Sequence, residues 1–138
     1  MHQTLPARSL LELLGKVENE AGQGSPVCVA VVNASGKLAA FWGMDGTPDR
    51  VVTIAQNKAY TAMRMGTSTK AFRERLQREQ LAAADFCDAS LTPLEGGIPL
   101  MGVNGRCVGG LGVSGRKTSD DHDLAVRLAD MLQHALVG

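Results

Sequence analysis

The chain has 138 residues and a mass near 14.5 kDa, and its 14 basic and 14 acidic side chains give a formal net charge of zero. This size suits one domain, 1–138, whose 44% of apolar residues can form a core without a metal or a disulfide. Zero net charge and an aromatic content of 4% argue against nucleic acid as a partner.

The beginning of the chain lacks the apolar run of a signal peptide, because Glu12 interrupts the leucines from Leu10 to Leu14. No run approaches the roughly 18 apolar residues that cross a bilayer. We therefore expect a cytoplasmic protein without a membrane partner. Cys28 and Cys107 lie in apolar, strand-like runs, which predicts buried reduced thiols, and no cysteine or histidine spacing indicates a metal site.

The first half of the chain predicts a helix, a hairpin and a second helix. Apolar residues at helical spacing predict a helix over about 8–21, which Gly22 and Gly24 end. The runs 26–32 and 37–42, on either side of a turn that ends at Gly36, predict a β-hairpin. Asp49 is a suitable N-cap for a helix that reaches Met65 and ends at Gly66.

The second half predicts a helix, a second hairpin and a final helix. Residues 67–69 can cap a helix over about 69–82, whose charged face is most simply solvated. The runs 97–103 and 106–113 flank Asn104-Gly105, a strong hairpin signal. The last helix follows Gly115, with Thr118 or Ser119 as its cap. This order favours an α/β domain with an antiparallel sheet of four or five strands and helices packed on it.

Glycine is unusually frequent, with 16 in the chain. Eight of these fall within twenty residues: Gly96, Gly97, Gly102, Gly105, Gly109, Gly110, Gly112 and Gly115. A segment so poor in side chains forms tight turns, close-packed backbone or a surface that a ligand approaches. The sequence leaves these three interpretations open.

Five segments together resemble one known family. They are 29–38 (Val-Ala-Val-Val-Asn-Ala-Ser-Gly-Lys-Leu), 44–46 (Met-Asp-Gly), 58–62 (Lys-Ala-Tyr-Thr-Ala), 96–100 (Gly-Gly-Ile-Pro-Leu) and 109–115 (Gly-Gly-Leu-Gly-Val-Ser-Gly). In this order, across nearly the whole chain, they resemble the GlcG/HbpS family, which includes the C-terminal domains of PduO-type corrinoid adenosyltransferases. The resemblance implies a profilin-like fold with helices on both faces of the sheet, self-assembly into homo-oligomers, and a small ligand such as haem or a corrinoid (cobalamin).

Two positions depart from the family pattern. Many relatives begin the second strand with a histidine and place an arginine before Met-Asp-Gly, whereas this chain has Lys37 and Gly43 there. A protonated lysine is a poor iron ligand, and glycine supplies no cation for a propionate. Of the three histidines, we consider His122 the candidate ligand, against the alternative of an exposed helix residue.

A second candidate site is an anion pocket where the segment ending in Gly115 meets the N-terminus of the last helix. Asp120, Asp121 and Asp123 oppose an anion there unless they face away. The resemblance adds Lys58 as the cation and Ser114 as a hydrogen-bond donor. The backbone of Gly96 and Gly97 can close over the ligand.

The sequence leaves three functions open. The first is an accessory protein that binds a small ligand, most simply haem or a related tetrapyrrole. The second is an enzyme acting on a small oxygenated metabolite of the glycolate, propanediol or glycerol type, although no residue shows a nucleophile with an adjacent base. The third is a structural or interaction subunit in which the glycines serve packing.

Overall fold

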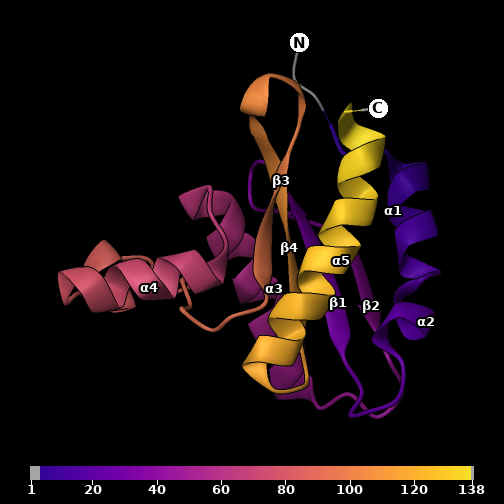
Figure 1. Ribbon diagram of the computed structural model, residues 1–138, viewed down its shortest axis with the longest axis horizontal. Helices are drawn as coiled ribbons and strands as arrows, with labels where there is room; N and C mark the ends of the chain where they lie inside the picture. Colours follow the sequence, from indigo (N-terminus) through magenta and orange to yellow (C-terminus); the bar gives the residue numbers. More distant parts are fainter. Residues whose placement is uncertain (1–3, 138) are drawn as a thin grey trace.

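A computed structural model describes residues 4–137 of the chain. Its centre is one antiparallel sheet of four strands in the order β2-β1-β4-β3 (Figure 1). The strands are β1 (Cys28–Asn33), β2 (Leu38–Gly43), β3 (Gly97–Met101) and β4 (Cys107–Ser114). Both expected hairpins are confirmed, and the sheet has the smaller of the two expected strand numbers.

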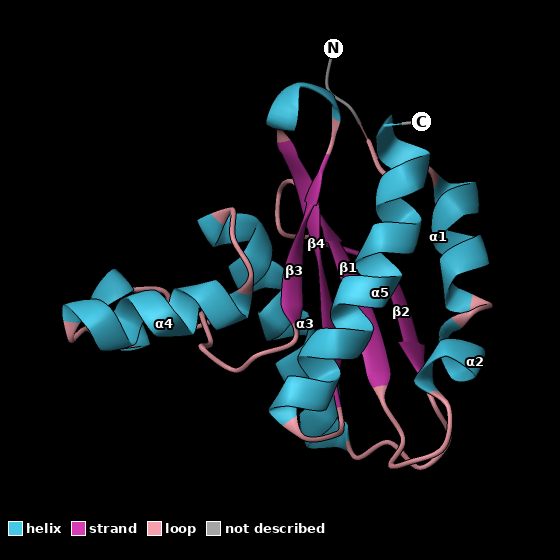
Figure 2. Cartoon of the chain, in the orientation of Figure 1, coloured by secondary structure: helices cyan, strands magenta, loops and turns pink. Residues whose placement is uncertain are grey.

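Helices cover both faces of the sheet, as the resemblance implied (Figure 2). They are α1 (Ala7–Leu14), α2 (Val17–Ala21), α3 (Asp49–Met65), α4 (Thr69–Glu79) and α5 (Thr118–Val137), with short 3-10 turns at Ala83–Phe86 and Val103–Gly105. Helices α1, α2 and α5 lie on one face and α3 lies on the other, while α4 projects past the edge strand β3. Within residues 4–137, no helix combines the length and hydropathy needed to cross a membrane.

The single helix expected over 8–21 is in fact two helices. At the end of α1 the N–H of Gly15 donates to the carbonyl of Leu11, and the N–H of Lys16, the residue before α2, donates to the carbonyl of Leu13. Glycine is a poor helix former, so the chain bends there while Leu13 and Val17 both stay buried. The N-cap of α1 is Pro6, whose side chain makes no capping hydrogen bond.

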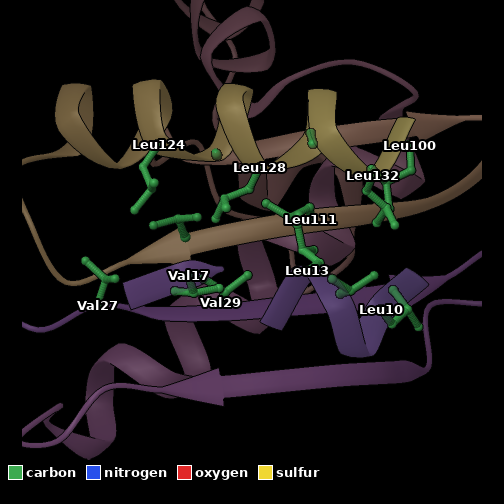
Figure 3. Close-up of a cluster of buried hydrophobic side chains, with 14 of the residues drawn as sticks. Leu10, Leu13, Val17, Val27, Val29, Leu100, Leu111, Leu124, Leu128 and Leu132 are labelled. Carbon is green, nitrogen blue, oxygen red and sulfur yellow. The ribbon is translucent and has the colours of Figure 1, made fainter. Parts of the chain in front are cut away.

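Strand β1 is buried on both faces, as its uninterrupted apolar sequence predicted. Val29 and Val31 point toward α1 and α5, where they meet Leu111 of β4 and Leu128 of α5 (Figure 3). The alternate residues of β1 point toward α3 on the opposite face. The core therefore consists of two layers with β1 and β4 between them.

The glycine-rich strands allow α3 to lie directly on the backbone of the sheet. A Cβ atom added at Gly110 or Gly112 would lie 2.1 Å from the carbonyl oxygen of Ala59 or Ala55, respectively. Both alanines are completely buried on the sheet-facing side of α3. At these positions the structure supports close-packed backbone as the reason for glycine.

Candidate functional site

Two opposite charges lie in the interior where α3, β4 and α5 meet. The Nζ of Lys58 is 3.2 Å from the Oδ2 of Asp121 and donates to the carbonyl oxygen of Val113 at 2.8 Å. The other carboxylate oxygen of Asp121 accepts from the backbone N–H of Arg116 at 3.0 Å. The two side chains are 1% and 2% exposed, so this is a buried ion pair held by additional hydrogen bonds.

Burial shifts the pKa of both members of the pair toward their neutral forms. Desolvation lowers the pKa of Lys58, and the nearby Asp121 carboxylate opposes that shift. Desolvation likewise raises the pKa of Asp121, against the charge of Lys58 and the backbone hydrogen bonds. Beside the pair, burial raises the pKa of the Cys28 thiol to about 11. The side chains of Lys58, Asp121 and Cys28 are therefore all shielded from solvent.

Several of the expected ligand-binding residues do gather around this pair. A Cβ atom on Gly96 would lie 2.9 Å from the Nζ of Lys58, and one on Gly97 would lie 2.3 Å from the backbone oxygen of Lys58. The backbone of Gly96 and Gly97 therefore packs directly against Lys58. Ser114 and Gly115 follow the carbonyl that Lys58 contacts, and Ser114 is buried. Lys58, the cation expected to bind an external anion, is already paired with Asp121. The structure therefore gives no support to the hypothesis of an enzyme that acts on a small oxygenated metabolite.

His122 lies in the first turn of α5 and is half-buried. Its Nδ1 atom is buried and has no hydrogen-bond partner within residues 4–137. The role of His122 as an iron ligand stays a prediction. Over the same residues, no group of three or more His, Cys, Asp or Glu side chains is placed to hold a metal ion.

A cavity of about 830 Å³ lies at the opposite end of the sheet. It is lined by Thr4, Leu5, Asn33, Ala34, Ser35, Ala39, Val103, Asn104, Arg106, Cys107 and Val108. The N-terminal segment, the β1–β2 turn and the β3–β4 hairpin meet there because β1 and β4 are antiparallel neighbours (Figure 1). The length of β4, about 23 Å at 3.3 Å per residue, separates the cavity from Ser114 and the start of α5.

The cavity has mixed walls suited to a small organic ligand. Leu5, Val103 and Val108 supply branched apolar side chains, and a Cβ atom on Gly109 would lie 3.2 Å from Leu5, so the N-terminal segment lies against β4. The volume falls within the range of about 300 to 1,000 Å³ typical of ligand pockets. Cys107 is half-buried in the wall, which corrects the expectation that its thiol is fully buried.

Sequence reasoning missed Asp121 and the cavity for different reasons. We interpreted Asp121 only as a carboxylate near the start of the last helix that would oppose a bound anion, yet it lies on the same stripe as the buried Ala125, Leu128 and Leu132. Its spacing of four, seven and eleven residues from them was a usable signal. The cavity depends on strand order, which hairpin signals alone do not contain.

These features define a class: a small α/β domain with helices on both faces of an open antiparallel sheet and a ligand-sized cavity at one end of it. Residues 5–130 match the family model described as "Haem degrading protein HbpS-like". The chain belongs to this HbpS-like family. That finding confirms the resemblance to the GlcG/HbpS family.

A similar protein sequence and two similar structures agree with membership of the HbpS-like family. Protein GlcG of Escherichia coli (strain K12) is 37% identical over 89 residues, which span 64% of this chain and 63% of that protein. The fold matches Klebsiella pneumoniae protein ORFY, with a TM-score of 0.85 and 24% identity over 96% of this chain and 92% of that one. A structure described as a PduOC:heme complex has a TM-score of 0.81 and 26% identity over 93% and 94% of the two chains.

Proposed function

We propose that this protein binds haem or a related tetrapyrrole in an accessory role, at the cavity between the N-terminal segment and the two hairpins. The observation that carries the proposal is the cavity itself, with a volume of about 830 Å³, walls that combine apolar and polar side chains, and a cation among its lining residues. A flat macrocycle with apolar faces and acidic substituents matches those walls. The haem-degrading description of the family and the haem complex of a relative with the same fold add support.

The residues that line the cavity fit a tetrapyrrole, although Lys37 stands where many relatives carry a histidine near the start of β2. Arg106 would pair with a propionate, and Leu5, Val103 and Val108 would contact the faces of the ring. Cys107 is a lining residue, and a thiolate is a group that is able to ligate iron, although its Sγ contacts the carbonyl oxygen of Gly109 at 3.2 Å in this structure. Bound haem would supply redox-active iron at this position.

An absorbance titration with haemin, run beside light scattering, tests the proposal. We expect a saturable shift of the Soret band with one haemin per chain or per dimer. Cobalamin forms the second arm, and a saturable change with it alone would replace haem by a corrinoid. Flat or non-saturating curves with both would refute the proposal. The variant His122→Ala should leave the haemin curve unchanged, because His122 lies at the other end of the sheet.

We also propose a cytoplasmic homo-oligomer, and the edge strand β2 supports the self-association. Its sequence, Leu38–Gly43, contains no charged residue and no proline, and it exposes half of Leu38 and 38% of Trp42. Unprotected apolar edges favour pairing with another chain. The opposite edge, β3, contains Pro99, which cannot donate to a neighbouring strand. A monomer mass by light scattering at micromolar concentration would contradict self-association.

A further inference from the structure

The cavity is nearly free of charge. Among the lining residues that lie within 4–137, Arg106 alone carries a charged side chain, and none is an aspartate or glutamate. The nearest polar side chain of the β1–β2 turn, Asn33, already accepts from the backbone N–H groups of Ser35 and Lys37. Within the described part of the chain, the charge at the cavity therefore comes from the guanidinium group of Arg106.

Arg106 is free to meet a ligand. It is exposed, it directly precedes β4, and within residues 4–137 its guanidinium forms no salt bridge with a carboxylate. Its backbone is fixed by the hairpin, because its N–H donates to Val103 and its carbonyl accepts from Gly102. A guanidinium with a fixed base, beside apolar walls, can bind a carboxylate with two parallel hydrogen bonds.

We infer that Arg106 makes the cavity selective for tetrapyrroles that carry free carboxylates over those whose side chains are esters or amides. This inference rests on the proposed function and specifies the ligand class of the same site. The apolar side chains of the walls contact the ring whether or not it contains a metal. Arg106 distinguishes ionised carboxylate substituents from esters and amides. A corrinoid with amidated side chains can accept hydrogen bonds from this guanidinium only at uncharged oxygens, so we expect it to bind more weakly than haem.

Metal-free porphyrins test this selectivity without interference from iron coordination. Protoporphyrin IX and its dimethyl ester are titrated by fluorescence into the full chain and into the variants Arg106→Gln, Arg106→Lys and Lys37→Gln. Lys37 is the matched control, because it is an exposed cation on the neighbouring turn that does not line the cavity. We expect the parent to bind the diacid about fivefold more tightly than the ester, as for a partly exposed ion pair. Arg106→Gln should remove that preference, Arg106→Lys, which keeps the charge but cannot make two parallel hydrogen bonds, should keep part of it, and Lys37→Gln should keep it.

The outcomes separate this inference from the proposed function. Equal binding of the diacid and the ester by the parent would overturn the selectivity while leaving tetrapyrrole binding intact. A loss in Lys37→Gln as large as that in Arg106→Gln would also overturn it, because the effect would then be one of overall charge. Failure of haemin and both porphyrins to bind would overturn the proposed function and this inference with it.

Discussion

Replacing Lys58 with methionine tests the buried ion pair at the centre of the fold. Methionine is similar in length and uncharged, so the variant leaves the Asp121 carboxylate in the interior without its cation. Both side chains are at most 2% exposed, and water cannot replace the lost partner. Leaving one charge of a buried pair uncompensated costs about 3–5 kcal/mol of unfolding free energy. For a chain of this size we expect the melting temperature to fall by about 10 to 20 °C.

The loss of unfolding free energy in Lys58→Met should become smaller as the pH is lowered. Burial already raises the pKa of Asp121 above the usual value of 3.8, and removing Lys58 raises it further. Between 3.8 and that raised pKa the folded state holds a proton that the unfolded state has released, so stability falls as the pH rises through this window. The deficit of Lys58→Met relative to the parent should therefore shrink as the pH is lowered from 7 toward 4.

Urea denaturation, followed by the fluorescence of Trp42 and by circular dichroism, measures both effects. The double variant Lys58→Met/Asp121→Asn is the control, because it removes the stranded charge and keeps an oxygen for the N–H of Arg116. We expect it to recover most of the lost stability. A loss below about 1 kcal/mol in Lys58→Met, typical of an exposed pair, would refute the reasoning. A deficit that does not change with pH would also refute it.

Two further predictions concern packing and thiol chemistry. Gly112→Ala should destabilise the fold by about 1–3 kcal/mol in thermal unfolding, since its Cβ would lie 2.1 Å from a carbonyl oxygen of α3; Gly15→Ala, with its nearest atom at 3.5 Å, should have little effect. If both alanine variants melt alike, close packing is not the reason for glycine in β4. Cys87 is exposed and should react with a thiol reagent at pH 8, whereas Cys28, buried with a pKa of about 11, should react only after unfolding. Rapid modification of Cys28 in the folded protein would contradict this assignment.

Most elements of the fold could be predicted from local signals. Asn104 and Gly105 both adopt positive φ, as a tight hairpin turn requires, and the second hairpin forms around them. Helix α3 reaches Met65 and ends at Gly66 in the left-handed conformation, as the sequence predicted. Its N-cap is Pro48, and Asp49, the expected N-cap, is the first helical residue. These features depend on neighbouring residues alone, so hydrophobic periodicity and turn chemistry were enough.

The candidate site depended on contacts between distant segments, which local signals do not contain. The pairing of Lys58 with Asp121 requires α3 and α5 to lie over the same end of β4, although 63 positions separate the two residues in the chain. The cavity similarly requires β1 to pair with β4, which joins the first turn to the second hairpin. The resemblance suggested a tetrapyrrole, and comparison of the three histidines then led to His122, whereas nothing in the sequence pointed to Arg106.

The position of the ligand is the most direct test of the account, and a haemin titration of two tryptophan variants measures it. Ala34 is exposed and lines the cavity, whereas Ala71 is exposed on α4, away from the cavity. We predict that Ala34→Trp fills the cavity and weakens haemin binding at least about tenfold, while Ala71→Trp binds haemin like the parent. Unchanged binding by Ala34→Trp, together with a lost Soret shift in His122→Ala, would place the ligand at the opposite end of the sheet and contradict the account.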